Sequence, residues 1–307
     1  MQTLILTAIR WTLRLVAVVS PRRAGRMALR LFRTPRGRRP VPRQVGEVMA
    51  RAERLGVDVD GHRVVAYRWS PPAGAAGSGR VLLAHGWESR AARLAVWVEP
   101  LLAAGFEVIA FDAPAHGDSE GRRTDPTGFV AAIDAVVARC GAPTVAVGHS
   151  LGALSLLLAT SAGDWLGRPN LDLERLVVVA GADSGRDAMA MFCRVLGLGD
   201  SFLPLILDAA AVRFGHPVTT LDGHRVFAAR HVPTLWLHDP ADDEVPLAAA
   251  ERVAAACPHV QLERVDGLGH HRIARDPGSI RRGVEFLSAP QTRPVAMPQG
   301  AAVRPAV

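Results

Sequence analysis

The sequence predicts an α/β fold in which a mostly parallel β-sheet carries helices on both faces. Short apolar segments typical of buried strands alternate along the chain with longer segments of helical periodicity. Turn residues such as Gly, Pro and Asp separate the two kinds of segment. The chain has 307 residues, 49% of them hydrophobic, which is enough to bury the core of one large domain.

The elements follow one another in a regular order. Residues 57–67 alternate apolar and polar side chains about an Asp-Gly turn, which predicts a β-hairpin. Further strands are predicted at 81–84, 108–111, 145–147, 176–179, 234–237 and 260–265. Helices are predicted near 91–104, 126–139, 151–161, 247–256 and 279–287. This alternation favours a parallel sheet that is covered on both faces.

One interval breaks the alternation. More than fifty residues separate Val179 from Thr234, and they contain helical apolar patterns at 188–196 and 202–214. Such an insertion usually lies over the active site of a sheet enzyme as a lid, so we expect a helical cap at about 183–230. Its candidate substrate contacts are Met189, Phe192 and Phe202. Apolar residues with helical spacing can equally form ordinary helical core, and about half of those in the insertion are expected to do so.

Residues 1–45 are expected to form a basic arm that ends in a linker at 33–43. Residues 1–54 contain 13 Arg and 2 Glu, a net charge of +11 in a chain of +7, so the rest is mildly acidic. Arginines spaced three or four apart among apolar residues predict amphipathic helices within residues 1–33. The apolar run is too short for a transmembrane helix and fits a signal peptide poorly. Peripheral association with an anionic membrane and packing against the body both stay open.

Composition excludes several other classes. Cys140, Cys193 and Cys257 are too few and too scattered for a disulfide framework or a metal cluster, so we expect a cytoplasmic protein without metal or other cofactor. The arm carries no nucleic-acid-binding motif, so no nucleic acid partner is expected. Residues 291–307 are rich in Pro, Ala and Arg, which predicts a disordered tail.

The most informative motif lies in residues 144–158, where Gly148-His149-Ser150-Leu151-Gly152 joins an apolar strand to an apolar helix. The G-x-S-x-G pattern predicts a nucleophile elbow, a sharp turn that exposes the serine. A serine hydroxyl needs a base and an oxyanion site before it reacts. Ser150 is therefore a candidate nucleophile that needs partners elsewhere in the chain.

The partners follow other predicted strands. Functional side chains of a parallel sheet gather at the carboxyl ends of its strands. Asp242 follows the strand at 234–237, and His270 follows the strand at 260–265. A serine, an acid and a histidine therefore fall at one edge of the sheet, in the chain order Ser, Asp, His.

Five motifs in residues 55–290 resemble the α/β-hydrolase family, in the order of that family. They are His85-Gly86, the D-x-x-x-H-G-x-S loop at 112–119, G-H-S-L-G at 148–152, D-D-E-V-P at 242–246 and G-L-G-H at 267–270. Within the family the chain is similar to esterases, lipases and lysophospholipases with a small helical cap. The resemblance implies an α/β-hydrolase domain over residues 46–290.

The resemblance also implies a catalytic triad and an activity. Ser150 would attack an acyl carbonyl, His270 would accept its proton and Asp242 would orient the imidazolium. Asp243 is the alternative acid, and His271 lies one position past the G-x-G-H pattern. The implied activity is hydrolysis of carboxylic esters, lipid or fatty acyl esters among them, through an acyl-enzyme intermediate. Asp239 is expected to cap its turn instead.

Further roles are expected near the nucleophile, and two alternatives to ester hydrolysis stay open. The backbone N–H groups of Trp87 and Leu151 are the implied oxyanion-hole donors. His149, beside the nucleophile, is expected to pack or to line the substrate pocket. An acyltransferase with the same motifs is one alternative, and a non-catalytic binding protein that keeps the fold is another. A serine at the elbow argues against dehalogenase and epoxide-hydrolase chemistry, for which the family uses an aspartate.

Overall fold

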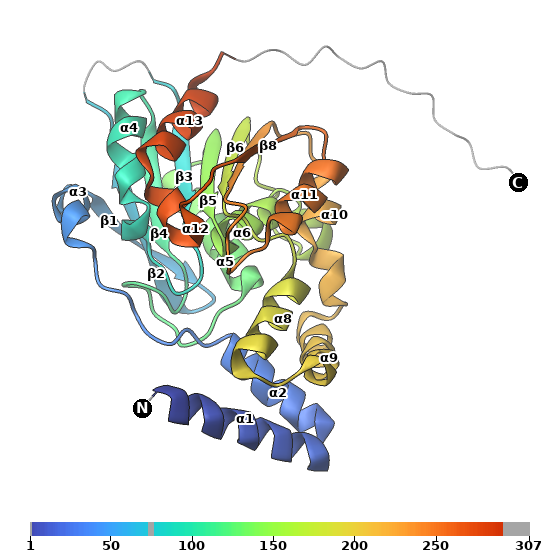
Figure 1. Cartoon of the computed structure of the whole chain (residues 1–307). Coiled ribbons are helices and arrows are strands. Elements are labelled where there is room, and N and C mark those ends of the chain that lie inside the picture. The colour runs from blue at the N-terminus through green and yellow to red at the C-terminus, as the bar shows by residue number, and fades with distance from the viewer. Residues whose placement is uncertain (1, 73–76, 291–307) are drawn as a thin grey trace, which may run out of the picture.

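A computed structural model describes residues 2–72 and 77–290, so the tail expected at 291–307 lies outside the described residues (Figure 1). Within these residues, eight strands form one sheet in the order β1-β2-β4-β3-β5-β6-β7-β8. Strands β1, β2 and β4 pair antiparallel, and the remaining neighbours pair parallel. The strands are β1 (Glu53–Val59), β2 (His62–Trp69), β3 (Arg80–Ala84), β4 (Glu107–Asp112), β5 (Val145–His149), β6 (Arg175–Val179), β7 (Thr234–His238) and β8 (Val260–Arg264).

The structure confirms the α/β class, the hairpin and the six predicted strands. The helix expected at 91–104 differs, because it starts with two 3₁₀ turns, η2 (Ala91–Arg93) and η3 (Ala95–Trp97), before α4 (Val98–Ala103). At the start of this segment the backbone N–H of Ala91 donates a hydrogen bond of 2.8 Å to the buried carboxylate of Asp112. That bond anchors the chain to β4 at the point where a regular helix was expected to begin.

Helices cover both faces of the sheet and build two separate cores (Figure 1). One face carries α5 (Pro126–Cys140), α6 (Leu151–Ala159), α10 (Gly223–Phe227) and α11 (Leu247–Ala256). The other face carries α4 and α13 (Pro277–Ser288). Every residue of β5 and β7 is buried, as parallel strands covered on both faces require. The short helices are α3 (Gly46–Ala50), α7 (Ala162–Trp165), α12 (Gly269–Arg272), η1 (Arg43–Val45), η4 (Asp200–Phe202), η5 (Val218–Leu221) and η6 (Ile273–Arg275).

A third core lies outside the sheet layers and joins two distant parts of the chain (Figure 1). Helices α1 (Gln2–Val19) and α2 (Pro21–Phe32) form what we call the N-terminal hairpin. Helices α8 (Gly185–Leu196) and α9 (Leu203–Phe214) belong to the insertion at 183–230, which we call the cap. Buried residues from both segments form this core: Leu13, Ala24, Ala28, Leu29, Met189, Cys193, Leu196, Phe202, Ile206 and Ala210.

Small residues let α2 approach α9 closely. A Cβ atom at Gly25 would lie 2.1 Å from the carbonyl oxygen of Leu205, so any larger residue would force the helices apart. Arg10 and Arg14 each donate a hydrogen bond of 2.7 Å to a carbonyl at the C-terminal end of α8, where the helix dipole favours a cation. The N-terminal hairpin therefore packs against the cap rather than against the sheet.

Residues 33–43, expected to be a linker, form ion pairs with the sheet body. Arg33 pairs with the buried carboxylate of Asp125 at 2.7 Å, and Arg36 pairs with Glu88 at 2.9 Å. Breaking the first pair would leave a buried carboxylate without its cation, which is costly. The segment is extended but anchored, and it continues the N-terminal hairpin onto the body.

Candidate active site

Three predicted side chains meet at the carboxyl edge of the parallel strands. Ser150 directly follows β5, Asp242 lies in the loop after β7, and His270 lies in α12 after β8. Ser150 and His270 are 120 positions apart in the chain, and β6 and β7 lie between their strands, β5 and β8, in the sheet. The loops at the carboxyl edge bring the two side chains together across this distance.

The backbone at Ser150 is strained. Its φ of 55° and ψ of −122° lie in a region that residues with a side chain rarely adopt. A Cβ at Gly148 would lie 2.5 Å from the Cα of Ala153, and one at Gly152 would lie 2.2 Å from a carbonyl oxygen of β3. Only glycine fits at these two positions of the G-x-S-x-G motif, and the turn holds Ser150 at its apex.

Ser150, His270 and Asp242 form a continuous hydrogen-bonded chain. The distance from Ser150 Oγ to His270 Nε2 is 2.9 Å, and the distance from His270 Nδ1 to Asp242 Oδ2 is 2.7 Å. Because the carboxylate can only accept, Nδ1 carries the proton and Nε2 is left to accept from the serine hydroxyl. This geometry suits proton transfer from a serine to a histidine.

The surroundings of Asp242 favour its ionised form. Burial opposes ionisation, but the hydrogen bond and charge of His270 and two backbone N–H donors outweigh it and lower the pKa of Asp242. The donors are the N–H groups of Glu244 and Val245, at 2.9 and 2.8 Å from Oδ1. The sequence reasoning did not single out His238, whose Nε2 lies 3.7 Å from Oδ2 of Asp242. Burial lowers the pKa of His238.

The two neighbouring aspartates occupy different environments. The side chain of Asp243 is exposed, whereas Asp242 is buried against His270. Asp239 is also buried and accepts a hydrogen bond of 2.8 Å from the N–H of Ala241 within its own turn. It accepts two further N–H bonds from the loop that leads to His270, so it holds that loop in place.

The histidines beside His270 also differ. His271 has a side chain that is 65% exposed, and its 2.8 Å contact with Glu244 raises the pKa of His271. His149 is buried and donates from Nε2 to the backbone carbonyl of His270 at 2.9 Å. Burial, followed by repulsion from His270, lowers the pKa of His149 to about 3, so it stays neutral near pH 7. His149 therefore positions the segment that carries His270.

The expected oxyanion donors border Ser150. Leu151 is the first residue of α6, whose N-terminal end favours negative charge. Trp87 follows Gly86, where a Cβ would lie 2.9 Å from the Cβ of Ser150, so this loop passes directly beside the serine. Trp87 and Leu151 both line the cavity that opens at Ser150.

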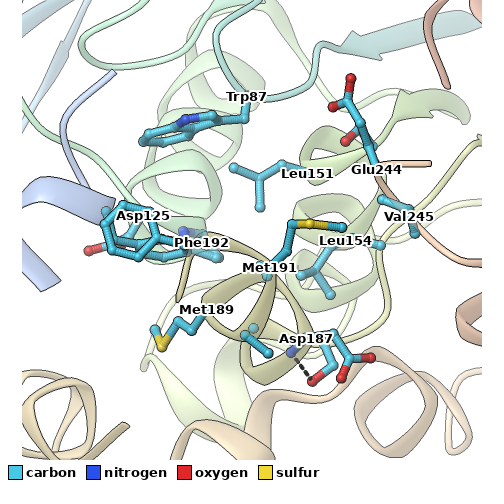
Figure 2. A pocket seen from close by; sticks show the side chains of 18 of the residues that line it. Trp87, Asp125, Leu151, Leu154, Asp187, Met189, Met191, Phe192, Glu244 and Val245 are labelled. Carbon is cyan, nitrogen blue, oxygen red and sulfur yellow. Dashed lines mark hydrogen bonds between the residues drawn. The ribbon is translucent and has the colours of Figure 1, made fainter. Parts of the chain in front are cut away.

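A cavity of about 790 Å³ extends from Ser150 between the body, the cap and the N-terminal hairpin. Small-molecule sites usually occupy about 300–1,000 Å³, so this cavity is in the upper part of that range. Figure 2 shows Trp87 and Phe192 on opposite sides of it, with the side chain of Met191 beside Leu154. The lining is mainly apolar, which suits a ligand with a large apolar part.

Two of the four expected substrate contacts reach this cavity. Met189 and Phe192 line it, whereas His149 and Phe202 are not among its described lining residues. His149 lies instead behind His270. Phe202 is only 4% exposed and belongs to the core between the cap and the N-terminal hairpin. His149 was expected, from its place beside Ser150, either to pack or to line the pocket, and it packs. Phe202 was expected from the apolar pattern of its helix, which does not identify the partner that the ring packs against.

The sequence reasoning missed the part of the cavity that the N-terminal hairpin contributes. Leu6, Leu29 and Phe32 line it. The ring of Phe32 stacks on Trp87 with centroids 6.4 Å apart and meets Phe192 edge-on at 5.4 Å. The apolar spacing of 29–32 was an available signal, but periodicity does not say which partner a helix faces.

Three histidines near Ser150 lie close enough together to be considered as metal ligands. His149, His270 and His271 place ring nitrogens within 4.8 Å of one another. Both ring nitrogens of His270 are already engaged by Ser150 and Asp242, and a metal ligand needs a free nitrogen lone pair. The arrangement fits proton transfer and does not fit a metal centre.

Comparisons with known proteins agree on the family. The model of the alpha/beta hydrolase family matches residues 81–280. A pimeloyl-[acyl-carrier protein] methyl ester esterase from Xanthomonas campestris pv. campestris is 29% identical over 230 residues, which covers 62% of this chain and 87% of that protein. The family match begins at residue 81, so it does not include the N-terminal hairpin.

Solved structures share the fold. An esterase from Pyrococcus furiosus matches with a TM-score of 0.59 and 18% identity, covering 83% of this chain and 95% of that one. A monoacylglycerol lipase from Paleococcus ferrophilus matches with a TM-score of 0.52 and 24% identity, covering 73% and 98%. At these identities the likeness describes the arrangement of the elements and not the substrate.

Proposed function

Because the chain belongs to the alpha/beta hydrolase family, we propose that it is a serine hydrolase that cleaves carboxylic esters. The observation that carries this proposal is the hydrogen-bonded chain from Ser150 through His270 to Asp242. The names of the relatives support ester chemistry, since they include an esterase and a lipase.

The proposed reaction has two halves. In the first, Ser150 Oγ attacks the ester carbonyl carbon while its proton passes to Nε2 of His270, which then protonates the departing alcohol. In the second, water loses a proton to His270 and attacks the acyl carbon. The proton returns to Ser150 Oγ as the carboxylic acid leaves. Asp242 stays ionised throughout and stabilises the imidazolium.

The developing negative charge needs donors on the side of the carbonyl oxygen. The N–H groups of Trp87 and Leu151 are the proposed donors, supported by the close approach of the Gly86 loop to Ser150. One such donor typically stabilises a transition state by about 3 kcal/mol. Because these are backbone groups, a change of side chain at either position is expected to affect the cavity more than the chemistry.

A direct test compares wild-type protein with Ser150→Ala on p-nitrophenyl acetate, with the products identified. We expect free acetate from wild type, no hydrolysis above background from Ser150→Ala, and the same melting temperature for both. The serine-hydrolase proposal fails if wild type cleaves no acyl ester, or if Ser150→Ala keeps its activity. Transfer of acetyl to an added alcohol in place of water would identify an acyltransferase.

We also propose that the outer face of α1 binds the surface of an anionic membrane. Four apolar side chains on this face are exposed, namely Trp11 (57%), Leu15 (66%), Val18 (86%) and Val19 (87%). Arg22 and Arg23 follow at the start of α2 and are exposed as well. An apolar helical face bordered by arginines suits the headgroup region of an anionic bilayer. Among the described helices, none has the length and apolar composition to cross a bilayer.

Vesicle binding tests the membrane proposal. Val18→Glu combined with Val19→Glu is expected to weaken binding to phosphatidylglycerol vesicles by at least about tenfold. Hydrolysis of a soluble acetyl ester should not change, because the outer face of α1 is not in the site. Val41→Glu, at an exposed valine outside the helix, is the control. Equal binding of all three proteins would refute membrane association through α1.

A further inference from the structure

The N-terminal hairpin supplies one wall of the cavity that opens at Ser150. Leu6 comes from α1, and Leu29, Leu31 and Phe32 come from α2. Without these side chains the cavity would open to solvent on that side. The hairpin lies outside the residues that the family match covers, so the family pattern does not account for this wall.

This wall is held firmly in place. Ala24 and Ala28 are fully buried at the contact with the cap, and Gly25 leaves no room for a side chain against the Leu205 carbonyl. At the end of α2, Phe32 packs between Trp87 of the body and Phe192 of the cap. A helix fixed at both ends presents a defined surface to a ligand.

The wall is also apolar along its length. Arg33 and Arg36, which follow α2 in the chain, also line the cavity, and each is paired with a carboxylate. They are therefore not free to bind an anionic group at the far end of a substrate. An uncharged hydrocarbon chain matches such a surface better than a polar or acidic tail.

The cavity is long as well as apolar. Leu151, Leu154 and Leu158 line it on one face of α6. At 1.5 Å rise per residue, Leu151 and Leu158 are about 10 Å apart along the helix axis. An extended chain advances roughly 1.2 Å per bond, so this distance alone matches about eight bonds.

We propose that the N-terminal hairpin is the outer wall of an acyl-chain site, and that Leu6, Leu29 and Phe32 select esters with medium to long alkyl chains. The inference rests on the proposed ester hydrolysis at Ser150 and names the substrate class of that same site. The hairpin thus has two functional faces: the inner face contacts the acyl chain, and the outer face is the proposed membrane surface.

The test is the dependence of kcat/KM on chain length for acetyl, octanoyl and palmitoyl p-nitrophenyl esters. Wild type is expected to prefer the two longer chains. Leu29→Trp fills the cavity at the inner face and should lower the ratio of palmitoyl to acetyl kcat/KM by at least about tenfold. Val212→Trp places the same residue at a position of α9 that is 85% exposed and does not line the cavity, so it should leave that ratio unchanged.

A second pair of variants removes the wall as a whole. Gly25→Val cannot pack against α9, whereas a Cβ at Gly37 meets no atom within 4 Å, so Gly37→Val is the matched control. Gly25→Val should lose the preference for long chains, keep acetyl hydrolysis and become sensitive to proteolysis in α1 and α2. Gly37→Val should behave as wild type.

The outcomes separate the two proposals. Wild type that cleaves no acetyl ester overturns the serine-hydrolase proposal. Wild type that cleaves acetyl ester but does not prefer longer chains overturns the acyl-chain site alone. An unchanged chain-length ratio in both Leu29→Trp and Gly25→Val has the same consequence, because each alters the wall by a different route.

Discussion

The sheet body and the region formed by the cap and the N-terminal hairpin differ in how their cores are built. In the body, strands and helices alternate along the chain, and the helices pack on both faces of one sheet. In the cap and hairpin, Leu29 packs in one core with Met189, although about 160 residues separate them. The first core depends on local alternation, and the second depends on a long-range contact between two helical segments.

The difference corresponds to a division of roles between the two regions. The proposed catalytic groups Ser150, Asp242 and His270 all belong to strand ends of the body, where the sheet fixes their separation. The cap and the hairpin contribute most of the apolar cavity wall. If this division holds, changes in the body should alter the rate for every ester, and changes in the hairpin should alter the choice among esters.

The largest effect is expected from His270. His270→Gln removes the base beside Ser150 and should reduce kcat by about 10⁵–10⁶-fold for short and long esters alike. His271→Gln, one residue away and exposed, should change kcat less than threefold. Steady-state kinetics on acetyl and octanoyl esters would measure both. A larger loss of kcat in His271→Gln than in His270→Gln would show that His271 is the base, contrary to the role proposed for His270.

The next effect concerns the acid. Asp242→Asn should lower kcat by about 10⁴-fold, because it no longer holds His270 in the tautomer that accepts a proton. The exposed neighbour provides the control, since Asp243→Asn keeps the bond between Asp242 and His270. Similar losses in the two variants would contradict the role proposed for Asp242.

A smaller effect tests whether the two regions are separable. Arg33→Met removes the ion pair to the buried carboxylate of Asp125 and should destabilise docking of the hairpin by about 1–3 kcal/mol. Hydrogen exchange should then speed up in α1 and α2 while β5 and β7 stay protected. Arg22→Met, at an exposed arginine of α2, is the control. Uniformly faster exchange across the body would show that the regions unfold as one unit.

The smallest effect is a change in one titration. Glu244 raises the pKa of His271, so Glu244→Gln should lower that pKa toward its usual value of 6.5. The raised pKa contributes stability that is present below the unfolded-state value and is lost as pH rises through the folded-state value. Two-dimensional NMR of the imidazole protons would follow the titration. An unchanged pKa of His271 in Glu244→Gln would show that the pair does not form in solution.

The body could be predicted well from the sequence because its signals are local. Apolar runs gave the strands, and five motifs in a fixed order gave the fold family. The residues proposed for catalysis sit next to strand ends that those runs define. Asp242 could be chosen over Asp243 only from motif position, since neighbouring carboxylates look alike until burial and hydrogen bonding separate them.

The cap and the hairpin could be predicted only in part. Helical periodicity in residues 1–33 identified amphipathic helices but not their partner, because an apolar face fits a membrane or another helix equally well. The same ambiguity misplaced Phe202, which packs in the third core, and hid Phe32, which reaches the cavity. Close contact at Gly25 depends on the backbone of α9, and no local pattern reports that.

The strained Ser150 of the body is the proposed nucleophile, and His270 is proposed to activate it. A fluorophosphonate probe followed by peptide mass spectrometry tests both parts in one measurement. We expect wild type to carry the probe on Ser150 alone, with His270→Gln labelled at least about a thousandfold more slowly. Labelling of another serine, or labelling of Ser150 that does not depend on His270, would contradict this account.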